Sequence, residues 1–432
     1  MKNVGIICEY NPFHNGHKYQ LDKAREISGA DNVICIMSGS FMQRGEPAAW
    51  NKWARAEMAV RNGADLVIEL PVVYSCQAAE IFATGAIKVF NQMKVVNSLC
   101  FGSETGNLKT MIELAGILAE EPEELKVAIR SKLGDGLVFP KAYQLAVLDY
   151  LKSNKGLNDA EPLTAPSLLM TPNNILGIEY LKALILSNSK IEPYTIKRIG
   201  SAHNDNEIKN NFTSATSIRR EILENGFTEK LENSLPFESL SILKTAGKTT
   251  TWENFKEILF YKLRSTNISE IQQYAYISEG IENRILKALL HSDSVNDLID
   301  RVKTKRYTRT SIQRILAAIL LGIKKEDIKN FKVSASPSYI RVLALNENGG
   351  KIISEMKKLG VENIINKFAS FKSGDPSINR MLTLDVRATE VYFSVLEGTG
   401  ITRRPGLVDF LQSPIIINKA QTVSQIKQNK SV

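Results

Sequence analysis

Cysteine is scarce in this sequence, with four residues in 432, and no two of them are spaced as a CxxC pair. A disulfide framework and a cysteine-based zinc site are therefore excluded, and a reducing compartment is expected. Long apolar runs are absent as well. The apolar stretch after Lys2 ends at Glu9, and 315–323 is far shorter than the ~20 residues of a membrane span. We expect a cytoplasmic protein without a secretion signal or a membrane anchor.

Acidic residues are the minority among the charged side chains. Lys and Arg number 55 against 46 Asp and Glu, which gives a formal net charge of +9 at pH 7. With 43% hydrophobic and 23% charged residues, the composition is globular and excludes a disordered or collagen-like chain. The positive balance favours a polyanionic partner, nucleic acid above all, although a mildly basic enzyme has the same composition.

Short, continuous apolar runs alternate with helix-periodic segments in the first quarter of the chain. The runs lie at 4–8, 33–37, 66–70 and 98–101, and the helical segments at 16–27, 52–61 and 80–90. Strand, helix, strand in repetition predicts an α/β fold with a parallel sheet. Such sheets bind ligands beyond the carboxyl ends of their strands, so the loops there are the first candidates for a site.

The length corresponds to two or three domains at ~150 residues each. Further helices are expected at 108–118, 125–132, 142–151, 174–186 and from about 213, with a strand at 194–199. From 226 to 322 the pattern is almost wholly helical, and strands and helices return at 340–345, 351–359, 364–368 and 378–396. We predict an α/β domain over residues 1–225 and a basic, mainly helical region over 226–432.

Two of the four histidines, His14 and His17, lie in EYNPFHNGHK, directly after the first expected strand. Pro12 ends the extended stretch, so both imidazoles fall on one face of a helix start, where free N–H groups already favour phosphate. The imidazoles can donate hydrogen bonds to a phosphoryl group as charge develops on it. Gly16 lets a nucleotide approach the backbone closely. An HxxH pair alone also arises by chance or binds a metal; the intervening glycine and the position after the first strand favour a nucleotide.

The HNGH segment resembles the HxGH signature of the nucleotidylyltransferase superfamily, whose Rossmann-like domain is shared with class I aminoacyl-tRNA synthetases. A narrower resemblance is carried by GIICEYNPFHNGHKYQL, SGSFMQRGEPA, ADLVIELP, PNNILGIEY and SATSIRR. Together these motifs are similar to the bacterial tRNA(Met) cytidine acetate ligase family.

The resemblance implies a reaction in two steps. Members of the family use ATP to activate acetate as acetyl-adenylate and then acetylate the exocyclic amine of the wobble cytidine of elongator tRNA(Met). AMP and pyrophosphate are released. The resemblance therefore implies ATP, acetate and that tRNA as substrates, and we expect Mg²⁺ because pyrophosphate must leave with its charge neutralised.

The loop SGSFMQRGEPA follows the second strand, where Gly39 and Gly45 permit a tight backbone and Gln43 and Arg44 present donors. Such a loop would close over acetate or phosphates, and an exposed turn with an incidental arginine is the alternative. We assign catalytic roles to His14, His17 and Arg44. The resemblance assigns ATP binding to Ile7, Cys8, Glu9, Tyr10, Asn11, Pro12, Phe13, His14, Asn15, Gly16, His17, Gly102, Asn173, Arg198, Ser217 and Arg219.

Some of these assignments are choices between neighbours. Asn173 and Asn174 both stand at a helix start, where one can cap the helix and the other can contact ATP. Arg198 is preferred to Lys197 because its fixed fork suits phosphate oxygens. Gly102 could equally be a turn glycine.

The SATSIRR segment resembles the second superfamily signature, so Ser217 and Arg219 are expected to grip the triphosphate, with Ser214 and Thr216 as caps. SATSIRR has no lysine in the role seen in the KMSKS motif of the synthetases, so residue roles transfer from the synthetases only loosely. Glu9 and Asp65 are candidate magnesium partners at strand ends, and His203 is a loop histidine that could reach the site.

A dense basic segment lies at 301–314, RVKTKRYTRTSIQR, which contains a tyrosine and no acid. Such clusters make phosphate contacts, and an aromatic ring among them can stack on a base. We assign RNA binding to Arg301, Lys305, Arg306, Tyr307, Arg309 and Arg314, with Arg341, Lys351, Arg403 and Arg404 as a possible continuation. A solvated helix face is the alternative.

Three functions are compatible with these features. The first is the acetate ligase that acts on tRNA. The second is a small-molecule nucleotidylyltransferase that adenylylates a metabolite, although such enzymes are compact and the basic region is then surplus. The third is a non-catalytic RNA-binding protein, which the intact HNGH and SATSIRR motifs disfavour.

Overall fold

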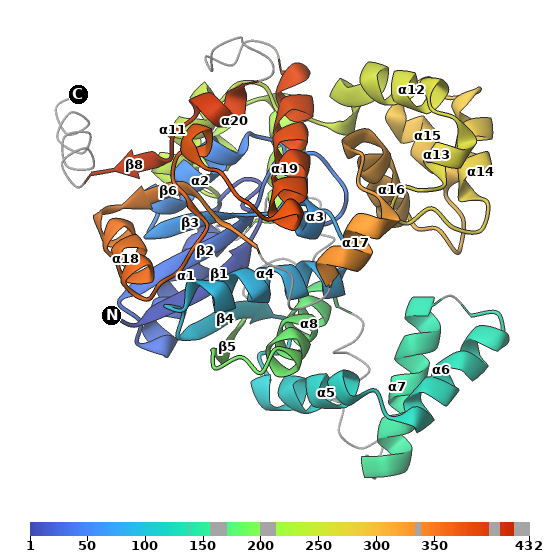
Figure 1. Cartoon of the computed structure of the whole chain (residues 1–432), viewed down its shortest axis with the longest axis horizontal. Helices are drawn as coiled ribbons and strands as arrows, with labels where there is room; N and C mark the ends of the chain where they lie inside the picture. Colours follow the sequence, from blue (N-terminus) through green and yellow to red (C-terminus); the bar gives the residue numbers. More distant parts are fainter. Residues whose placement is uncertain (138, 156–170, 199–212, 333–337, 397–406, 419–432) are drawn as a thin grey trace.

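The computed structural model describes residues 1–137, 139–155, 171–198, 213–332, 338–396 and 407–418 (Figure 1). Within these residues, an eight-stranded sheet has the order β5-β4-β1-β2-β3-β6-β7, with β8 pairing β6. The strands are β1 Asn3–Cys8, β2 Asn32–Ser38, β3 Leu66–Leu70, β4 Ser98–Ser103, β5 Glu192–Lys197, β6 Ile340–Asn346, β7 Ile364–Ile365 and β8 Ile415–Ile417.

Helices connect these strands. Up to β6 the helices are α1 Asn15–Ser28, α2 Lys52–Arg61, α3 Val72–Ser75, α4 Ala79–Met93, α5 Leu108–Glu120, α6 Glu123–Gly134, α7 Phe139–Lys155, α8 Pro172–Leu186, α9 Ala215–Asn225, α10 Glu229–Glu232, α11 Phe237–Thr245, η1 Trp252–Phe255, α12 Lys256–Ser265, α13 Ile268–Ile271, α14 Ile281–Leu289, α15 Val295–Val302, α16 Arg309–Leu321 and α17 Lys325–Lys332. The later ones are α18 Glu347–Lys358, η2 Phe368–Ser370, α19 Pro376–Ser394 and α20 Val408–Leu411.

The predicted α/β fold with a parallel sheet is confirmed. Strands β5, β4, β1, β2 and β3 pair in parallel. Ile34 and Ile36 of β2 belong to one apolar cluster and Val33 and Cys35 to another, so the sheet is buried on both faces. This double burial explains why its strands are continuous apolar runs rather than alternating ones.

The order of the strands reverses at β1. The chain runs from β1 outward to β2 and β3, and then returns to the other side of β1 to form β4 and β5. In such a sheet the crevice beyond the carboxyl ends of the two strands at the reversal is the ligand site. Here those strands are β1 and β4, which end at Cys8 and Ser103.

The sheet contains strands from both sides of the predicted domain boundary at residue 225. β6 lies antiparallel to β3, and β7 and β8 both pair with β6. Of the predicted strand 364–368, only the first two residues form β7, and Phe368 begins the 3-10 helix η2; β8 was not predicted. The segment after β6 therefore completes the N-terminal sheet, and the division into two functional regions stays a prediction.

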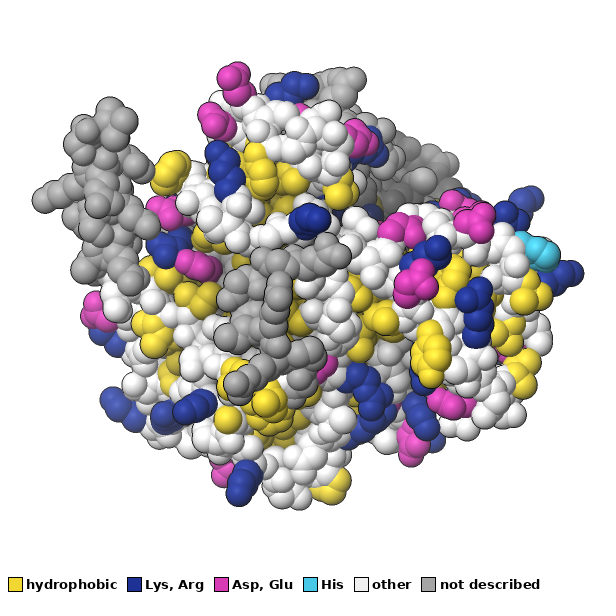
Figure 2. Space-filling model, turned by 90° about the horizontal axis from the view of Figure 1, so that it is seen from above, with side chains coloured by type: hydrophobic (Ala, Val, Ile, Leu, Met, Phe, Trp, Pro, Cys, Tyr) yellow, Lys and Arg dark blue, Asp and Glu magenta, His cyan; other side chains and the backbone are white. Residues whose placement is uncertain are grey.

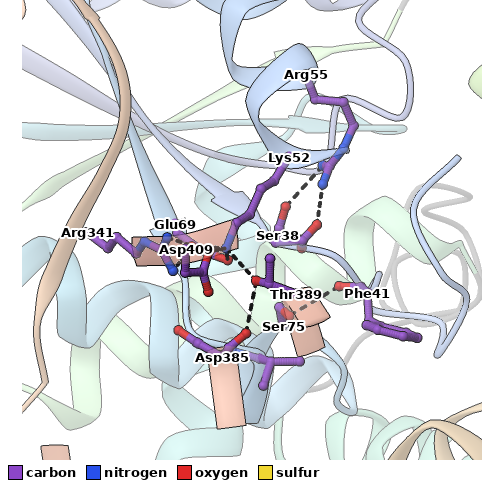
Figure 3. A network of polar contacts seen from close by, with 12 residues as sticks. Ser38, Phe41, Lys52, Arg55, Glu69, Ser75, Arg341, Asp385, Thr389 and Asp409 are labelled. Carbon is purple, nitrogen blue, oxygen red and sulfur yellow. Dashed lines mark hydrogen bonds and ion pairs between the residues drawn. The ribbon is translucent and has the colours of Figure 1, made fainter. Parts of the chain in front are cut away.

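A buried ion-pair network joins β6 and α20 to the first half of the chain (Figure 3). Lys52 Nζ lies 2.8 Å from Glu69 Oε1 and 3.1 Å from Asp409 Oδ1. Arg341 pairs with the same two carboxylates, at 3.2 Å and 2.6 Å. The network holds two cationic and two anionic side chains, so its charges cancel. Buried ionised groups need such pairing, because an unpaired charge inside the protein is strongly destabilising. Arg341 is only 3% exposed, so its predicted place on an RNA-binding surface is wrong.

The helices α12–α16 form a lobe to the right of the sheet, and α5–α7 extend below it (Figure 1). One apolar cluster runs from the sheet into this lobe, because Ile36 of β2 and Leu259 of α12 belong to the same cluster. Among the described residues, no helix is long and apolar enough to cross a membrane.

Candidate functional site

A cavity of about 210 Å³ lies at the reversal of the strand order. Six of its lining residues were predicted to bind ATP: His14, Gly16, His17, Gly102, Asn173 and Arg198. The cavity is therefore bounded by the loop after β1, the end of β4, the start of α8 and the end of β5. It also contains Lys197, Ser214 and Thr216, which were second choices in the sequence.

His14 and His17 are held by the start of α1. The Gly16 N–H donates to Nδ1 of His14 at 3.1 Å, and the His14 N–H donates to Nδ1 of His17 at 3.3 Å. Because both Nδ1 atoms accept, the proton of each neutral ring is on Nε2. The rings stack with centroids 3.7 Å apart. A Cβ at Gly16 would lie 2.9 Å from Cε1 of His14, so glycine keeps this arrangement open.

Both imidazoles are neutral at pH 7. Burial, together with the nearby positive charges of Arg198 and Arg219, lowers the pKa of His14 to about 3. Burial also holds the pKa of His17 well below its usual range, and His14 and Arg198 act in the same direction. Each ring is therefore a neutral N–H donor in a positive environment, which suits an anionic ligand such as a phosphate.

The segment from Ile7 to Phe13 supports this site and does not line the cavity. The rings of Tyr10 and Phe13 are buried and lie 4.8 Å and 5.6 Å from the ring of His17. Asn11 accepts the Ala49 N–H on its side chain at 2.8 Å, and its carbonyl accepts from Arg219 at 2.7 Å. Its predicted contact with ATP stays a prediction.

A second polar group lies where the loops after β1 and β2 meet. The Gln43 N–H donates to Oε1 of Glu9 at 2.7 Å. Burial raises the pKa of Glu9, while the Gln43 N–H and the positive charges of Arg44, Arg219 and Arg55 oppose that shift. Arg44 is therefore close to the Glu9 carboxylate, outside the lining of the cavity.

Arg55 ties these two loops together from inside the protein. It is fully buried and donates to the carbonyls of Trp50 at 2.9 Å, Glu9 at 2.6 Å and Ser38 at 3.0 Å, and also to Gly39. Figure 3 shows its side chain directed toward Ser38. One guanidinium thus satisfies carbonyls from both loops and fixes their spacing.

Asn173 is oriented by a carboxylate that the sequence analysis missed. Glu104 accepts from Nδ2 and N–H of Asn173 at 2.8 Å and 3.2 Å, and from the Asn174 N–H at 2.8 Å. Asn174 in turn accepts the Glu104 N–H at 2.9 Å, so it is the residue that fastens the helix start to β4. Oδ1 of Asn173 is left facing Arg198, whose NH1 lies at 3.4 Å. The sequence does contain a signal for Glu104: an acidic residue directly after a strand, together with the PNN segment at the start of a later helix.

The start of α9 forms another wall. Ser214 accepts the Ser217 N–H at 3.1 Å as the N-cap, so Ser217 is buried beneath the cavity surface and Ser214 is the hydroxyl that lines it. Arg219 reaches the Asn11 carbonyl at 2.7 Å and lies close enough to His14 to affect its pKa. The lining residues Tyr19, Gln20 and Thr213 were not predicted. The one-turn spacing of Tyr19 and Gln20 from Gly16 on α1 was the signal for them.

The structure contradicts one of the two proposed magnesium partners. Asp65 precedes β3, at the amino end of the strand, where Arg25 donates to it at 2.8 Å and the Val33 N–H at 2.8 Å. It is therefore a structural ion-pair partner away from the cavity. Among the described residues there is no group of three or more His, Cys, Asp or Glu that could hold a metal ion. His203 lies outside the described residues.

The basic segment 301–314 is partly neutralised by acids from neighbouring segments. Arg301 pairs with Asp297, Arg306 with Glu279 and Arg309 with Asp300, at 2.8, 2.5 and 2.8 Å. Figure 2 shows positive and negative side chains interspersed over the right-hand part of the molecule, where α12–α16 lie. Lys351 pairs with Glu347 at 2.8 Å, and Arg403 and Arg404 lie outside the described residues. RNA binding by this segment stays a prediction.

Comparison with known proteins is consistent with this geometry. The family model of the HIGH nucleotidyl transferases matches residues 1–404. The chain is 41% identical over 425 residues to the tRNA(Met) cytidine acetate ligase of Acetivibrio thermocellus, covering 96% of this chain and 100% of that one. The identity to the tRNA(Met) cytidine acetate ligase of Caldanaerobacter subterraneus subsp. tengcongensis is 42% over 420 residues, with 96% and 100% covered.

Two solved structures of Thermotoga maritima TmcAL are similar over nearly the whole chain. The apo form I has a TM-score of 0.89 and the form bound with alpha-thio ATP a TM-score of 0.87. Both are 34% identical in sequence, with 97% of this chain and 100% of that chain covered.

Proposed function

The chain belongs to the HIGH nucleotidyl transferase family, and from this premise we propose that it is an enzyme, a tRNA(Met) cytidine acetate ligase. It activates acetate with ATP and acetylates the N4 amine of the wobble cytidine of elongator tRNA(Met). The single observation that carries the proposal is the cavity at the β1/β4 reversal, where two neutral imidazoles and Arg198 surround the space of a phosphate group.

In the first step, an oxygen of acetate attacks the α-phosphorus of ATP. The bond from that phosphorus to its bridging oxygen breaks, and pyrophosphate leaves. The Nε2–H groups of His14 and His17 donate to phosphoryl oxygens as charge develops there, and Arg198 and Arg219 add positive charge. Because the rings are neutral and fixed by backbone hydrogen bonds, they need no reorganisation for this role.

In the second step, the cytidine amine attacks the acetyl carbonyl. The new C–N bond forms, the C–O bond to AMP breaks, and the amine loses a proton. A cytosine amine is a weak nucleophile, so the protein must hold it against the activated carbonyl, and positioning can supply much of the acceleration. We assign Arg44, beside Glu9 and Gln43, to the acetate end of the adenylate.

Mg²⁺ fits this site as a partner of the ATP phosphates rather than of a protein cage. Mg²⁺ keeps several waters and is commonly bound by one or two carboxylates together with substrate phosphates. No carboxylate of the described residues lines the cavity, and Glu9 lies behind the lining, where it accepts the Gln43 N–H, so the phosphates and water would hold the ion. When bound, the ion would neutralise charge on the leaving pyrophosphate.

The small-molecule nucleotidylyltransferase is the weaker alternative. It leaves the helices α12–α16 without a role, whereas the relatives named as tRNA(Met) cytidine acetate ligases match the chain through this region, at 96% coverage. The positive balance of the chain also favours a polyanionic substrate.

The proposal is tested by incubating the full chain with ATP, Mg²⁺, labelled acetate and bulk tRNA, and then analysing the nucleosides. We expect labelled N4-acetylcytidine together with AMP and pyrophosphate. Transfer of AMP to a metabolite without acetylcytidine would favour the alternative. No nucleotide chemistry at all would favour a non-catalytic RNA-binding protein.

A further inference from the structure

A second and larger cavity, of about 760 Å³, lies between the tip of α6 and the turn and helix of the basic segment. Lys305, Arg306, Tyr307 and Arg314 line it, whereas Arg301 and Arg309 do not. The structure thus separates the basic segment into residues that face a cavity and two arginines, Arg301 and Arg309, that pair with Asp297 and Asp300 of α15 outside it. We refer to this space as the basic cavity.

The charge of the basic cavity suits one phosphate group. Three cationic side chains and one carboxylate, Glu279, line it, so its net charge is +2. Glu279 pairs with Arg306 at 2.5 Å, whereas Lys305 and Arg306 remain exposed at the rim. A phosphate can therefore bind at the rim and share Arg306 with the carboxylate.

Aromatic rings give the same cavity a surface for a base. The hydroxyl of Tyr307 donates to the Ser278 carbonyl at 2.8 Å. The hydroxyl of Tyr276 accepts the Ala78 N–H at 3.0 Å and donates to Gln77. Because both hydroxyls are engaged within the protein, the rings are fixed in place, which lowers the entropic cost of stacking a base on them.

The backbone around the cavity is strained. Tyr276 and Glu279 have φ angles of 67° and 56°, in the left-handed region that non-glycine residues rarely adopt. Such residues cluster where a binding site over-determines the backbone. Here both of them line the cavity.

The basic cavity is also connected to the loop after β2. Arg314 donates from Nε to the Gln43 carbonyl at 2.8 Å, next to Arg44. Gly45 packs so tightly on α16 that a Cβ there would lie 2.4 Å from the backbone nitrogen of Arg314. The wall of the cavity and the loop assigned to acetate are therefore in direct contact.

We propose that the basic cavity binds one nucleotide of single-stranded RNA, with its base against the ring of Tyr307 and its phosphate on Lys305 and Arg306. The inference rests on the proposed function: the nucleotide belongs to the anticodon loop of the tRNA substrate. The bound nucleotide anchors that loop beside the acetate end of the site.

The test measures the affinity of the full chain for a fluorescein-labelled heptaribonucleotide with a central cytidine, at 50 and 200 mM KCl. K305A and R306A should each weaken binding about fivefold and reduce the slope of log Kd against log salt by about 0.7, the effect of one lost phosphate contact. Y307A should weaken binding by about tenfold, the range of one lost stacking contact, with the slope unchanged. K303A is the matched control: Lys303 is equally exposed in the same segment but lies outside the cavity.

Several outcomes overturn the inference. These are a wild-type chain that does not bind the heptamer, equal effects of K303A and K305A, wild-type affinity of Y307A, or equal affinity for an acidic heptapeptide. K305A should fold normally because the side chain of Lys305 is exposed. Y307F keeps the aromatic ring, so it should bind the heptamer more tightly than Y307A. Acetylcytidine formation by the wild type tests the proposed function separately. If it succeeds while the variants bind RNA normally, the cavity has been assigned wrongly and the proposed function stands.

Discussion

Replacing His14 with asparagine should change how the stability of the protein depends on pH. Asparagine is a good N-cap and can still accept the Gly16 N–H, so the helix start is kept. It cannot titrate. His14 has a pKa of about 3 in the folded protein and 6.5 when unperturbed, because burial disfavours its charged form. Between these values the unfolded chain binds more protons than the folded one, so His14 stabilises the fold less as the pH falls below about 6.5.

The size of the effect follows from those two values. Between pH 7 and pH 5, the free energy of unfolding of the wild type should fall by about 2 kcal/mol more than that of H14N. Urea denaturation of both proteins at the two pH values measures this difference. His17, Glu9 and Asp385 also titrate abnormally, but they are present in both proteins and largely cancel.

Two results would refute this reasoning. The first is an equal loss of stability in both proteins between pH 7 and pH 5. The second is a side-chain NMR titration of the wild type in which the resonance missing from H14N changes with a midpoint near 6.5. Either one would mean that His14 is solvated and can be an imidazolium in the free enzyme.

Three other substitutions test the supports of the site. E104Q weakens the clamp on Asn173 and should raise the KM for ATP about fivefold, the effect of ~1 kcal/mol, with a smaller change in kcat. An unchanged KM in steady-state kinetics would remove Glu104 from this role. R55K cannot reach all four carbonyls and should lower the free energy of unfolding by about 2–4 kcal/mol in urea. R61K, at the end of the same helix, keeps a cation beside Glu57 and Glu238, so it is the control and should cost little. D409N leaves Lys52 and Arg341 with one carboxylate and should cost about 3 kcal/mol by the same measurement, so a neutral outcome would contradict the buried network.

The parallel half of the fold could be predicted because its signals are local. The apolar run of β3 and the helix periodicity of α2 give the observed bounds, Leu66–Leu70 and Lys52–Arg61, without reference to distant residues. The site followed from the same logic. A loop after the first strand must lie at the carboxyl edge of the sheet, so His14 and His17 were placed correctly by their positions in the chain.

The features that the sequence did not predict correctly depend on contacts between residues far apart in the chain. Arg341 looks like a surface residue until β6 is known to pair with β3, which brings it to Glu69 and Asp409. Asp65 was proposed as a magnesium partner, but the fold places it at the amino end of β3 beside Arg25 and the Val33 N–H. In the basic segment, a sequence window without acids could not reveal Glu279, which the fold places beside Arg306.

The central claim is that two neutral imidazoles at the strand-order reversal bind the ATP phosphates during activation of acetate. Exchange of labelled pyrophosphate into ATP measures that step directly, because it requires the adenylate to form and to reverse. The exchange should depend on acetate in the wild type and fall at least ~100-fold in H17A while the unfolding midpoint stays close to that of the wild type. Exchange by H17A at the wild-type rate, or exchange by the wild type that proceeds equally without acetate, would contradict the account.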